Sequence, residues 1–458
     1  AISYSPAYPV MLSDAEMCEI IALHDATGDV DYVTCGYGSY LDFEGIIPPF
    51  THGEKLTTPL TTQLKAIVKH AVITSEAGVR TPDNAETIIA SGEADLVSIV
   101  RGQIADPHLA RKTTEGRPED IRGCISCNQM CWGRRSRDYW ISCLINPSVG
   151  REFEWGGDRF EKAAQPRSVL VVGAGPAGLE AARVAAERGH KVTVFEAASE
   201  AGGQVRLIAQ TKRRAEMIGI TDWRMAQCAA LGVEFRFNTW AEAEDVTALN
   251  PDLVIIATGG MAQKDILASG NELTVSAWDI LSGDVKPGQN VLLYDDAGDH
   301  TALQAAQLLA ESGAVVEVMT PDRTFAPDVM AMNLVPYMRA IQDKKVTFTV
   351  TYRLTSVAKE GNLIKATIDS DYSKLGITRS FDQVVVNHGT LPLDELYFAL
   401  KPRSVNLGAV DYDALIAGQP QTFGGGPAGF QLFRIGDAVE ARNIHAAIYD
   451  ALRLIAVM

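Results

Sequence analysis

The stretch Cys124-Ile-Ser-Cys127-Asn-Gln-Met-Cys131, followed by Cys143, divides this chain into two kinds of domain. Four of the seven cysteines lie here within twenty residues, in the spacing C-x2-C-x3-C-x11-C. Three close cysteines with one more distant partner are typical of loops that hold a 4Fe-4S cluster. Structural zinc sites usually pair two C-x2-C units, and the second unit is missing here. Unligated loop cysteines, or a disulfide in a secreted chain, are further alternatives, and the spacing favours the cluster over all of them.

The overall composition limits the classes of function. A chain of 458 residues, 47% of them hydrophobic, is long enough for two or three domains with large cores. Its net charge of −16 argues against nucleic acid and anionic membranes as partners. We expect no membrane-spanning helix, since no apolar run of about 20 residues occurs, and no signal peptide. Cys18, Cys35 and Cys228 lie in apolar segments and are expected to be core thiols, which fits a reduced, cytoplasmic setting.

A dinucleotide-binding fingerprint follows the cysteine stretch. The pattern predicts a buried strand over 168–172, a helix that ends near residue 189, and a second strand over 191–195. Glycines in the intervening turn allow the close approach of a pyrophosphate, and the helix N-terminus supplies a positive dipole. The acid at the end of the second strand, eighteen residues past Gly178, is well placed for a ribose hydroxyl. The fingerprint residues are Gly173, Gly175, Ala177, Gly178 and Glu196.

A second unit, from about 287 to 395, repeats this order with a strand over 290–294, a helix over 302–312 and a strand over 315–319. Its loop, Asp295-Asp-Ala-Gly-Asp299, contains one glycine and three acids. The acids favour the helix dipole but repel a pyrophosphate, and the missing glycines block its approach. We therefore expect a dinucleotide-type fold that binds no NAD(P)H.

Helices and strands alternate before the cysteine stretch. Strands are predicted over 30–37, 71–76 and 95–100, and helices over 12–28, 58–70 and 82–90. Ser13 is the expected N-cap of the first helix. This alternation, with crossover helices between strands, implies a parallel sheet.

Two strand ends in this region carry residues that suit a phosphate. Gly78-Val79-Arg80 and Arg101-Gly102 follow two successive strands. Backbone N–H groups at the start of a helix, together with the two donors of an arginine, bind anions well. Each arginine alone could be an ordinary surface residue, but their matching positions favour phosphate binding, as at the last two strands of (β/α)8 barrels.

A family resemblance rests on three segments: SEAGVRTPDNAETIIASGEADLVSIVRGQIADPHLARK, CISCNQMC and SCLINPSVGREF. Together they resemble the iron–sulfur flavoprotein branch of the old yellow enzyme group. That branch includes trimethylamine dehydrogenase, histamine dehydrogenase, dimethylglycine and N-methylproline demethylases, and 2,4-dienoyl-CoA reductase. The longer run from the cysteines to GREFEWGGDRF is most similar to the dimethylglycine and N-methylproline demethylases.

The resemblance implies three cofactors. FMN would be held in a barrel by Gly78, Val79, Arg80, Arg101 and Gly102, and a 4Fe-4S cluster by Cys124, Cys127, Cys131 and Cys143. FAD, or ADP in its place, would occupy the fingerprint domain, because both share the same adenosine contacts. Further expected contacts of that nucleotide are Gly203, Gln204, Ala257, Thr258, Gly259, Gly436 and Asp437.

The predicted fold class is α/β, with the C-terminal part of a (β/α)8 barrel, a 4Fe-4S loop and two Rossmann-like domains. Only about the last three barrel strands are visible, and about 120 residues cannot close a barrel that needs about 250. We therefore expect the sequence to be part of a longer chain. The predicted domains are the barrel part over 1–117, the cluster segment and linker over 118–160, the FAD- or ADP-binding domain over 161–286 with 396–458, and the degenerate NAD(P)-binding-like domain over 287–395.

The loop after the first predicted strand, GSYLDFEGIIPPF over 38–50, is expected on the catalytic face. Aromatic faces there could bind an alkylammonium group, since a cation–π contact contributes about 0.5–2 kcal/mol. Packing of a long loop explains the same residues equally well. The candidate catalytic residues are Tyr40, Asp42, Arg101 and Trp132, with Tyr37, Phe43 and Trp140 as further pocket candidates.

The predicted function is an FMN- and 4Fe-4S-dependent amine dehydrogenase that demethylates a small N-methylated amine. Hydride transfer to FMN would leave an iminium that water splits into formaldehyde and the demethylated amine. The electrons would leave through the cluster to an external carrier, expected to be electron-transferring flavoprotein. The alternatives are an NAD(P)H-dependent enoate or dienoyl-CoA reductase and an electron-transfer subunit without its own oxidation chemistry. We also expect a homo-oligomer.

Overall fold

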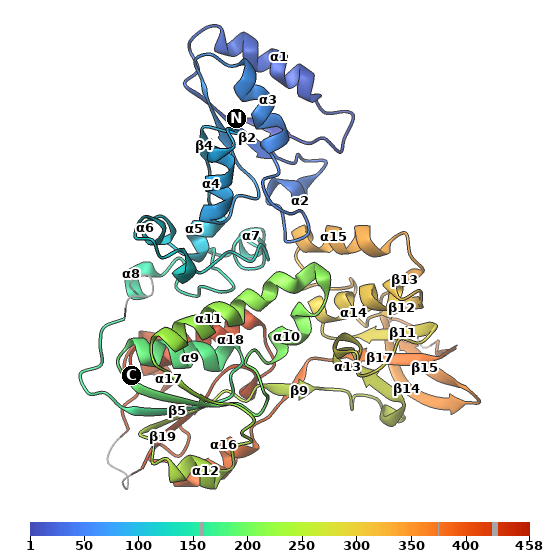
Figure 1. Ribbon diagram of the computed structural model, residues 1–458. Coiled ribbons are helices and arrows are strands. Elements are labelled where there is room, and N and C mark those ends of the chain that lie inside the picture. Colours follow the sequence, from blue (N-terminus) through green and yellow to red (C-terminus); the bar gives the residue numbers. More distant parts are fainter. Residues whose placement is uncertain (156–159, 374, 424–428) are drawn as a thin grey trace. The chain divides into compact units, whose positions relative to one another are not determined.

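The computed structural model describes residues 1–155, 160–373, 375–423 and 429–458, which form two compact units (Figure 1). Unit 1 comprises residues 1–150 and 330–336, and unit 2 comprises residues 151–329 and 337–458. Residues 156–159 of the run that ends GREFEWGGDRF lie outside the described residues. Within the described ranges, every helix is too short or too polar to cross a bilayer.

Unit 1 is built on a four-stranded parallel sheet in the order β1-β2-β3-β4. The strands are β1 Ile2–Tyr4, β2 Tyr32–Tyr37, β3 Val72–Ser75 and β4 Leu96–Val97. The parallel sheet was predicted, but the count of about three strands was wrong. The missed strand is β1, whose three residues are too few to predict a strand and which forms by pairing with Cys35, Gly36 and Tyr37 of β2.

Two helices cover this sheet through a shared apolar core. Helix α1 (Asp14–Asp25) begins at the predicted N-cap Ser13, which forms a capping box with Glu16. Met17 and Ile21 of α1 pack in one buried cluster with side chains of α3 (Thr58–Ile67), β2 and β3. Helix α4 (Pro82–Ala90) follows β3, as predicted.

The remainder of unit 1 is made of short helices and loops. These are α2 Phe43–Ile46, α5 Arg101–Ala105, α6 Leu109–Thr114, the 3-10 turn Pro118–Asp120, and α7 Trp132–Arg135. Residues 330–336, which include the first half of α15 (Ala331–Ile341), also belong to unit 1. There the buried amide of Asn333 donates a hydrogen bond of 2.8 Å to the carbonyl of Cys127.

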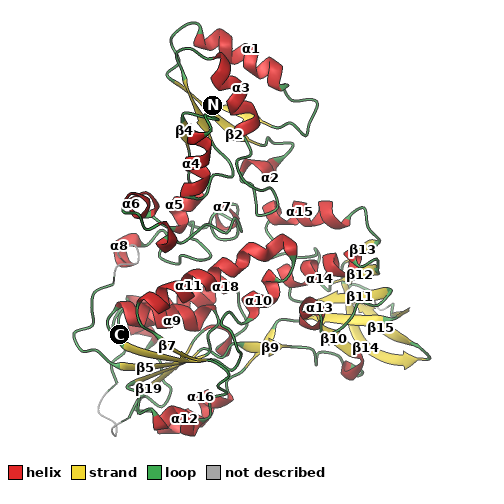
Figure 2. Cartoon of the chain, in the orientation of Figure 1, coloured by secondary structure: helices red, strands yellow, loops and turns green. Residues whose placement is uncertain are grey.

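The first sheet of unit 2 is parallel, five-stranded and ordered β19-β8-β5-β6-β7. Its strands are β5 Ser168–Val172, β6 Lys191–Phe195, β7 Glu234–Arg236, β8 Leu253–Ile256 and β19 Gln431–Arg434. Val169 and Val171 face a core with α9 and α18, whereas Leu170 and Val172 face the core of α12 and α16 (Figure 2). The sheet is thus buried on both faces, which explains the continuous apolar run of β5. The helices are α9 Pro176–Glu187, α12 Ala243–Ala248, α16 Glu395–Leu400 and α18 Ile444–Ile455, with α8 Glu152–Trp155, α10 Gln204–Ala209, α11 Gly219–Ala230 and α17 Tyr412–Ala417.

The second sheet of unit 2 is also parallel and five-stranded, in the order β10-β17-β11-β12-β13. Its strands are β10 Thr274–Ser276, β11 Asn290–Asp295, β12 Val315–Met319, β13 Val346–Thr349 and β17 Gln383–Asn387. Helices α13 (Ala277–Ser282) and α14 (His300–Glu311) cover one face. An antiparallel sheet of β14 Tyr352–Glu360, β15 Leu363–Ser370 and β16 Ile377–Phe381 covers the other. Strands β9 Gly260–Ala262 and β18 Thr390–Pro392 pair between the two halves of unit 2.

Candidate functional site

The four cysteines of the opening stretch come together in unit 1. Burial raises the pKa of the Cys127 and Cys131 thiols, and raises that of Cys143 to about 12, with the neighbouring cysteines adding to each shift. Such thiols are poor thiolates unless a bound metal stabilises the charged form. Ser126 and Asn128 adopt positive φ angles of 49° and 52°, which turn the backbone between the cysteines.

The spacing of the sulfurs bears on which metal these cysteines can hold. A tetrahedral zinc with Zn–S bonds of about 2.3 Å places its sulfurs about 3.8 Å apart. Among the described residues, Asp42, Glu44 and His52 form a group of possible metal ligands whose ligand atoms all lie within 4.8 Å of one another. None of the four cysteines belongs to that group. The cysteines are nevertheless near enough to raise one another's pKa.

The predicted phosphate residues lie at adjoining strand ends. A Cβ on Gly102 would come within 2.7 Å of the Arg80 carbonyl oxygen, which shows how closely the two ends approach. The guanidinium of Arg80, however, binds Glu54 at 2.8 Å and the carbonyl of Cys124 at 3.1 Å. Arg101 donates to Asn128 in the cysteine loop at 2.7 Å. Both arginines therefore join the strand ends of unit 1 to the cysteine loop, while Gly78 has a positive φ of 77° and Val79 is buried.

The loop after β2 brings aromatic residues together with acids. Tyr40 stacks on Phe43 at 6.0 Å between ring centroids, and Phe43 meets Trp132 edge-on at 5.7 Å. Tyr40 is 92% exposed, so one end of this aromatic row is open. The predicted candidates Tyr40 and Trp132 are thus connected through Phe43, whereas Tyr37 packs edge-on against Tyr4.

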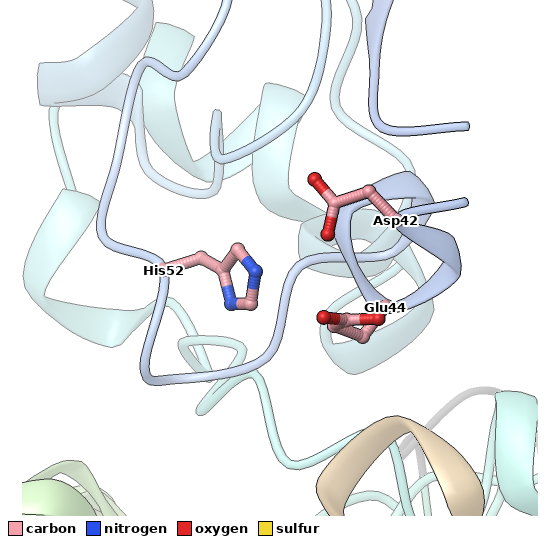
Figure 3. A group of neighbouring side chains, drawn as sticks. All are labelled: Asp42, Glu44 and His52. Atoms are coloured by element: carbon pink, nitrogen blue, oxygen red, sulfur yellow. The ribbon is translucent and has the colours of Figure 1, made fainter. Parts of the chain in front are cut away.

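Two further polar residues of this loop escaped the sequence analysis. Glu44 and His52 lie with Asp42 in one group whose ligand atoms are all within 4.8 Å of one another (Figure 3). The signal was present as Asp-x-Glu followed by a histidine in the same loop. It was not recognised because these side chains meet only when the loop folds back on itself.

A cavity of about 670 Å³ opens at the fingerprint turn of unit 2. Ten of the twelve predicted nucleotide contacts line it: Gly173, Gly175, Ala177, Glu196, Gly203, Gln204, Ala257, Thr258, Gly259 and Asp437. Gly178 and Gly436 do not, although Ile435, next to Gly436, does. Gly178 packs directly against the turn, since a Cβ there would lie 1.9 Å from the Gly173 carbonyl oxygen. Gly436 has a φ of 64° and approaches Ala177. The cavity also reaches Ile208, Trp278 and Leu393, beyond the fingerprint itself.

Two carboxylates mark different parts of this cavity. Glu196 accepts hydrogen bonds from the backbone N–H groups of Ala174 (2.7 Å) and Ala198 (2.8 Å), which fixes it beside the turn. Asp437 accepts a hydrogen bond from Gln204 at 3.1 Å, and burial raises its pKa. A buried acid with a raised pKa in a cavity is suited to hydrogen-bonding a polar ligand group.

The corresponding loop of the second sheet is filled by its own acids. Asp295 accepts hydrogen bonds from the N–H groups of Ala297 (3.2 Å) and Gly298 (3.1 Å). Asp299 caps α14 by accepting from Thr301 N–H at 2.9 Å. The amides that would bind a phosphate are therefore already bonded to carboxylates, and burial raises the pKa of Asp295 to about 7.

Comparison with known proteins first defines the class of protein to which this chain is similar. Residues 156–281 match the family model for pyridine nucleotide-disulphide oxidoreductases. The chain is 62% identical over 368 residues to the "probable N-methylproline demethylase" of Rhizobium meliloti (strain 1021), which covers 80% of this chain and 54% of that protein. It is 38% identical to the N,N-dimethylglycine/sarcosine dehydrogenase of Chromohalobacter salexigens (strain ATCC BAA-138), over 98% of this chain and 66% of that protein. A solved 2-naphthoyl-CoA reductase complex superposes with a TM-score of 0.84 at 28% identity, covering 100% of this chain and 64% of that one.

These similarities confirm the family resemblance. The chain belongs to the iron–sulfur flavoprotein branch of the old yellow enzyme group, beside demethylases and dehydrogenases of N-methylated amines. Its fold is confirmed as mixed α/β with parallel sheets and an oxidoreductase nucleotide domain. The chain spans only 54% and 66% of the two curated relatives.

Proposed function

We propose that this chain is part of a flavin- and iron–sulfur-dependent amine dehydrogenase that demethylates a small N-methylated amine of the dimethylglycine or N-methylproline type. The observation that carries this proposal is the 62% identity to a protein named for N-methylproline demethylation. An alignment over 80% of the chain includes the cysteine stretch wherever it begins. The substrate would lose a hydride from its methyl group, and water would split the resulting iminium into formaldehyde and the secondary amine.

The residues of unit 1 fit two of the proposed cofactors. Cys124, Cys127, Cys131 and Cys143 would hold the 4Fe-4S cluster, and the barrel strand ends with Gly78, Val79, Arg80, Arg101 and Gly102 would hold FMN. FMN would supply the hydride acceptor there, and the cluster would supply a one-electron route to an external carrier, for which we propose an electron-transferring flavoprotein. Arg80 and Arg101 connect the two places, since both bind the cysteine loop.

The aromatic row and its acids suit recognition of the substrate cation. Tyr40, Phe43 and Trp132 present ring faces and edges to an alkylammonium group, which cation–π attraction stabilises by about 0.5–2 kcal/mol for each ring. Phe43 is 36% exposed, so part of its ring remains available. Replacing Tyr40 by Ala should therefore raise KM for the amine more than it lowers kcat.

The cavity of unit 2 fits an adenine nucleotide, and we propose FAD, or ADP in its place. Support for FAD comes from the extension of the cavity past Gln204 and Asp437 to apolar residues of α10 and α13. ADP alone would leave this part unfilled. Denaturing the purified protein and identifying the released nucleotides by chromatography distinguishes the two.

Whether an amine or NAD(P)H reduces the flavin distinguishes this function from its closest alternative. The superposition on a 2-naphthoyl-CoA reductase makes a nicotinamide-dependent reductase the second candidate. The carboxylates of Asp295 and Asp299 occupy the amides that a nicotinamide dinucleotide would need. We expect dimethylglycine or N-methylproline to bleach the flavin absorbance of the purified protein, and NADH and NADPH to leave it unchanged. Rapid bleaching by NADPH without bleaching by either amine would favour the reductase.

A further inference from the structure

Asp42, Glu44 and His52 converge within a single loop of unit 1. Figure 3 shows the carboxylates of Asp42 and Glu44 extending from the α2 segment toward the imidazole of His52, which comes from the following loop. Their ligand atoms all lie within 4.8 Å of one another. None of the four cysteines belongs to this group.

The two carboxyl side chains are buried together. Asp42 is 3% exposed and Glu44 is 4% exposed. The Asp42 Oδ1 and Glu44 Oε1 atoms themselves have almost no solvent access. Carboxylates that are buried this closely together are well placed to coordinate a metal ion.

The backbone brings these groups together at a tight crossing. Gly38 has a φ of 80°, and a Cβ there would lie 2.4 Å from the backbone nitrogen of Ile46. The chain after β2 therefore folds directly over Gly38, which places α2 and its two acids against the loop that carries His52. His52 also contacts the Thr51 hydroxyl at 3.2 Å through its Nδ1 atom.

We propose that Asp42, Glu44 and His52 bind one divalent cation. Two carboxylates and an imidazole form a mixed oxygen and nitrogen set that suits Mn²⁺, Fe²⁺ or Zn²⁺. Donor atoms about 2.0–2.2 Å from one ion lie about 3.0–3.6 Å apart, so the group needs to contract by about an ångström. Rotation of the carboxylates of Asp42 and Glu44 supplies this movement. Three protein ligands leave coordination positions open for water or another ligand.

The test is a Mn²⁺ titration of the purified holoprotein, in which free Mn²⁺ is counted by its electron paramagnetic resonance signal. Mn²⁺ is chosen because it prefers carboxylate and imidazole to thiolate, so the cysteines do not compete. We expect one Mn²⁺ per chain for the unaltered protein. Glu44→Gln and His52→Gln should each weaken the binding at least about tenfold, because each removes a ligand.

A matched control removes two carboxylates from another part of unit 1. Asp83 and Glu86 are exposed on α4, and the double variant Asp83→Asn/Glu86→Gln should bind Mn²⁺ as tightly as the unaltered protein. His52 is only half-buried, so His52→Gln carries the test if circular dichroism shows that Glu44→Gln is unfolded. Absence of stoichiometric Mn²⁺ in the unaltered protein overturns the proposal, as does equal affinity in His52→Gln. Neither the Mn²⁺ stoichiometry nor the Mn²⁺ affinity depends on amine oxidation, so this experiment tests the metal site independently of the proposed demethylase function.

Discussion

Gly175 offers a way to test the nucleotide proposed for unit 2 without disturbing the fold. A Cβ at this position would meet no protein atom within 4 Å, and its φ of −73° suits any residue. Gly175 also lines the cavity at the fingerprint turn. The side chain of Gly175→Val would therefore project into the space where the pyrophosphate must approach.

Gly175→Val should change the folding free energy little and the free energy of nucleotide binding more. Gly175 is the N-cap of α9, and loss of a glycine cap costs about 1 kcal/mol, which the lower entropy of the unfolded valine chain offsets by about 0.4–1 kcal/mol. The folding free energy should thus change by less than about 1 kcal/mol. Overfilling a packed site costs typically 1–3 kcal/mol, which weakens nucleotide binding by roughly 5- to 150-fold.

The assay compares bound nucleotide with stability in the same preparation. Gly175→Val should lose its adenine nucleotide on extraction while keeping FMN and a far-ultraviolet circular dichroism spectrum like that of the unaltered protein. Ala248→Val, at an exposed position of α12, is the control for adding the same methyl groups. Gly178→Ala should instead fail to fold, because its Cβ would overlap the Gly173 carbonyl oxygen at 1.9 Å. A Gly175→Val protein with its full nucleotide content would place the nucleotide elsewhere and refute the reasoning.

Other predictions concern the cysteines and the acidic loop. Cys127→Ala should allow flavin reduction by the amine but stop turnover with the natural electron carrier, and steady-state activity that survives would remove the cluster from the electron path. Burial raises the pKa of Asp295 from 3.8 to about 7, so between these pH values the folded protein holds a proton that the unfolded chain has lost. The stabilising contribution of this group is therefore complete below about pH 4 and is lost as the pH rises to 7. Asp295→Asn should therefore raise stability at pH 8 by up to about 4 kcal/mol and change it little at pH 4, as measured by urea unfolding. A gain that is equal at both values of pH would contradict protonation as the cause.

Much of unit 2 was predictable because its signals are local. The strands 168–172, 191–195 and 315–319 match β5, β6 and β12 residue for residue, since buried parallel strands are rich in apolar and β-branched residues. Ser13 capped α1 as expected because a capping box needs only four neighbouring residues. These features depend on little beyond their own sequence.

The features that the sequence did not predict depend on contacts between residues far apart in the chain. Strand β1 exists through its pairing with β2, more than thirty residues away. Asp25 ends α1, but its carboxylate binds the N–H groups of Lys69, His70 and Ala71, which lower its pKa. The phosphate contact of Arg80 stays a prediction, but its bonds to Glu54 and to the carbonyl of Cys124 could not be predicted, because they join residues far apart in the sequence. Asp42 was identified from the loop, whereas its partners Glu44 and His52 required the crossing over Gly38.

The second dinucleotide-type sheet keeps the strand and helix order of such a fold although acids fill its loop. The backbone amides that would bind a phosphate are bonded to Asp295, so we expect no stabilisation of this sheet by a dinucleotide. Residues 330–336, which follow its strand β12, belong to unit 1, where Asn333 donates to the carbonyl of Cys127 and Met330 approaches Gly133. A Cβ on Gly133 would come within 2.7 Å of the Met330 side chain, which leaves no room for a larger residue between them. The segment 330–336 therefore packs against the cysteine loop within unit 1.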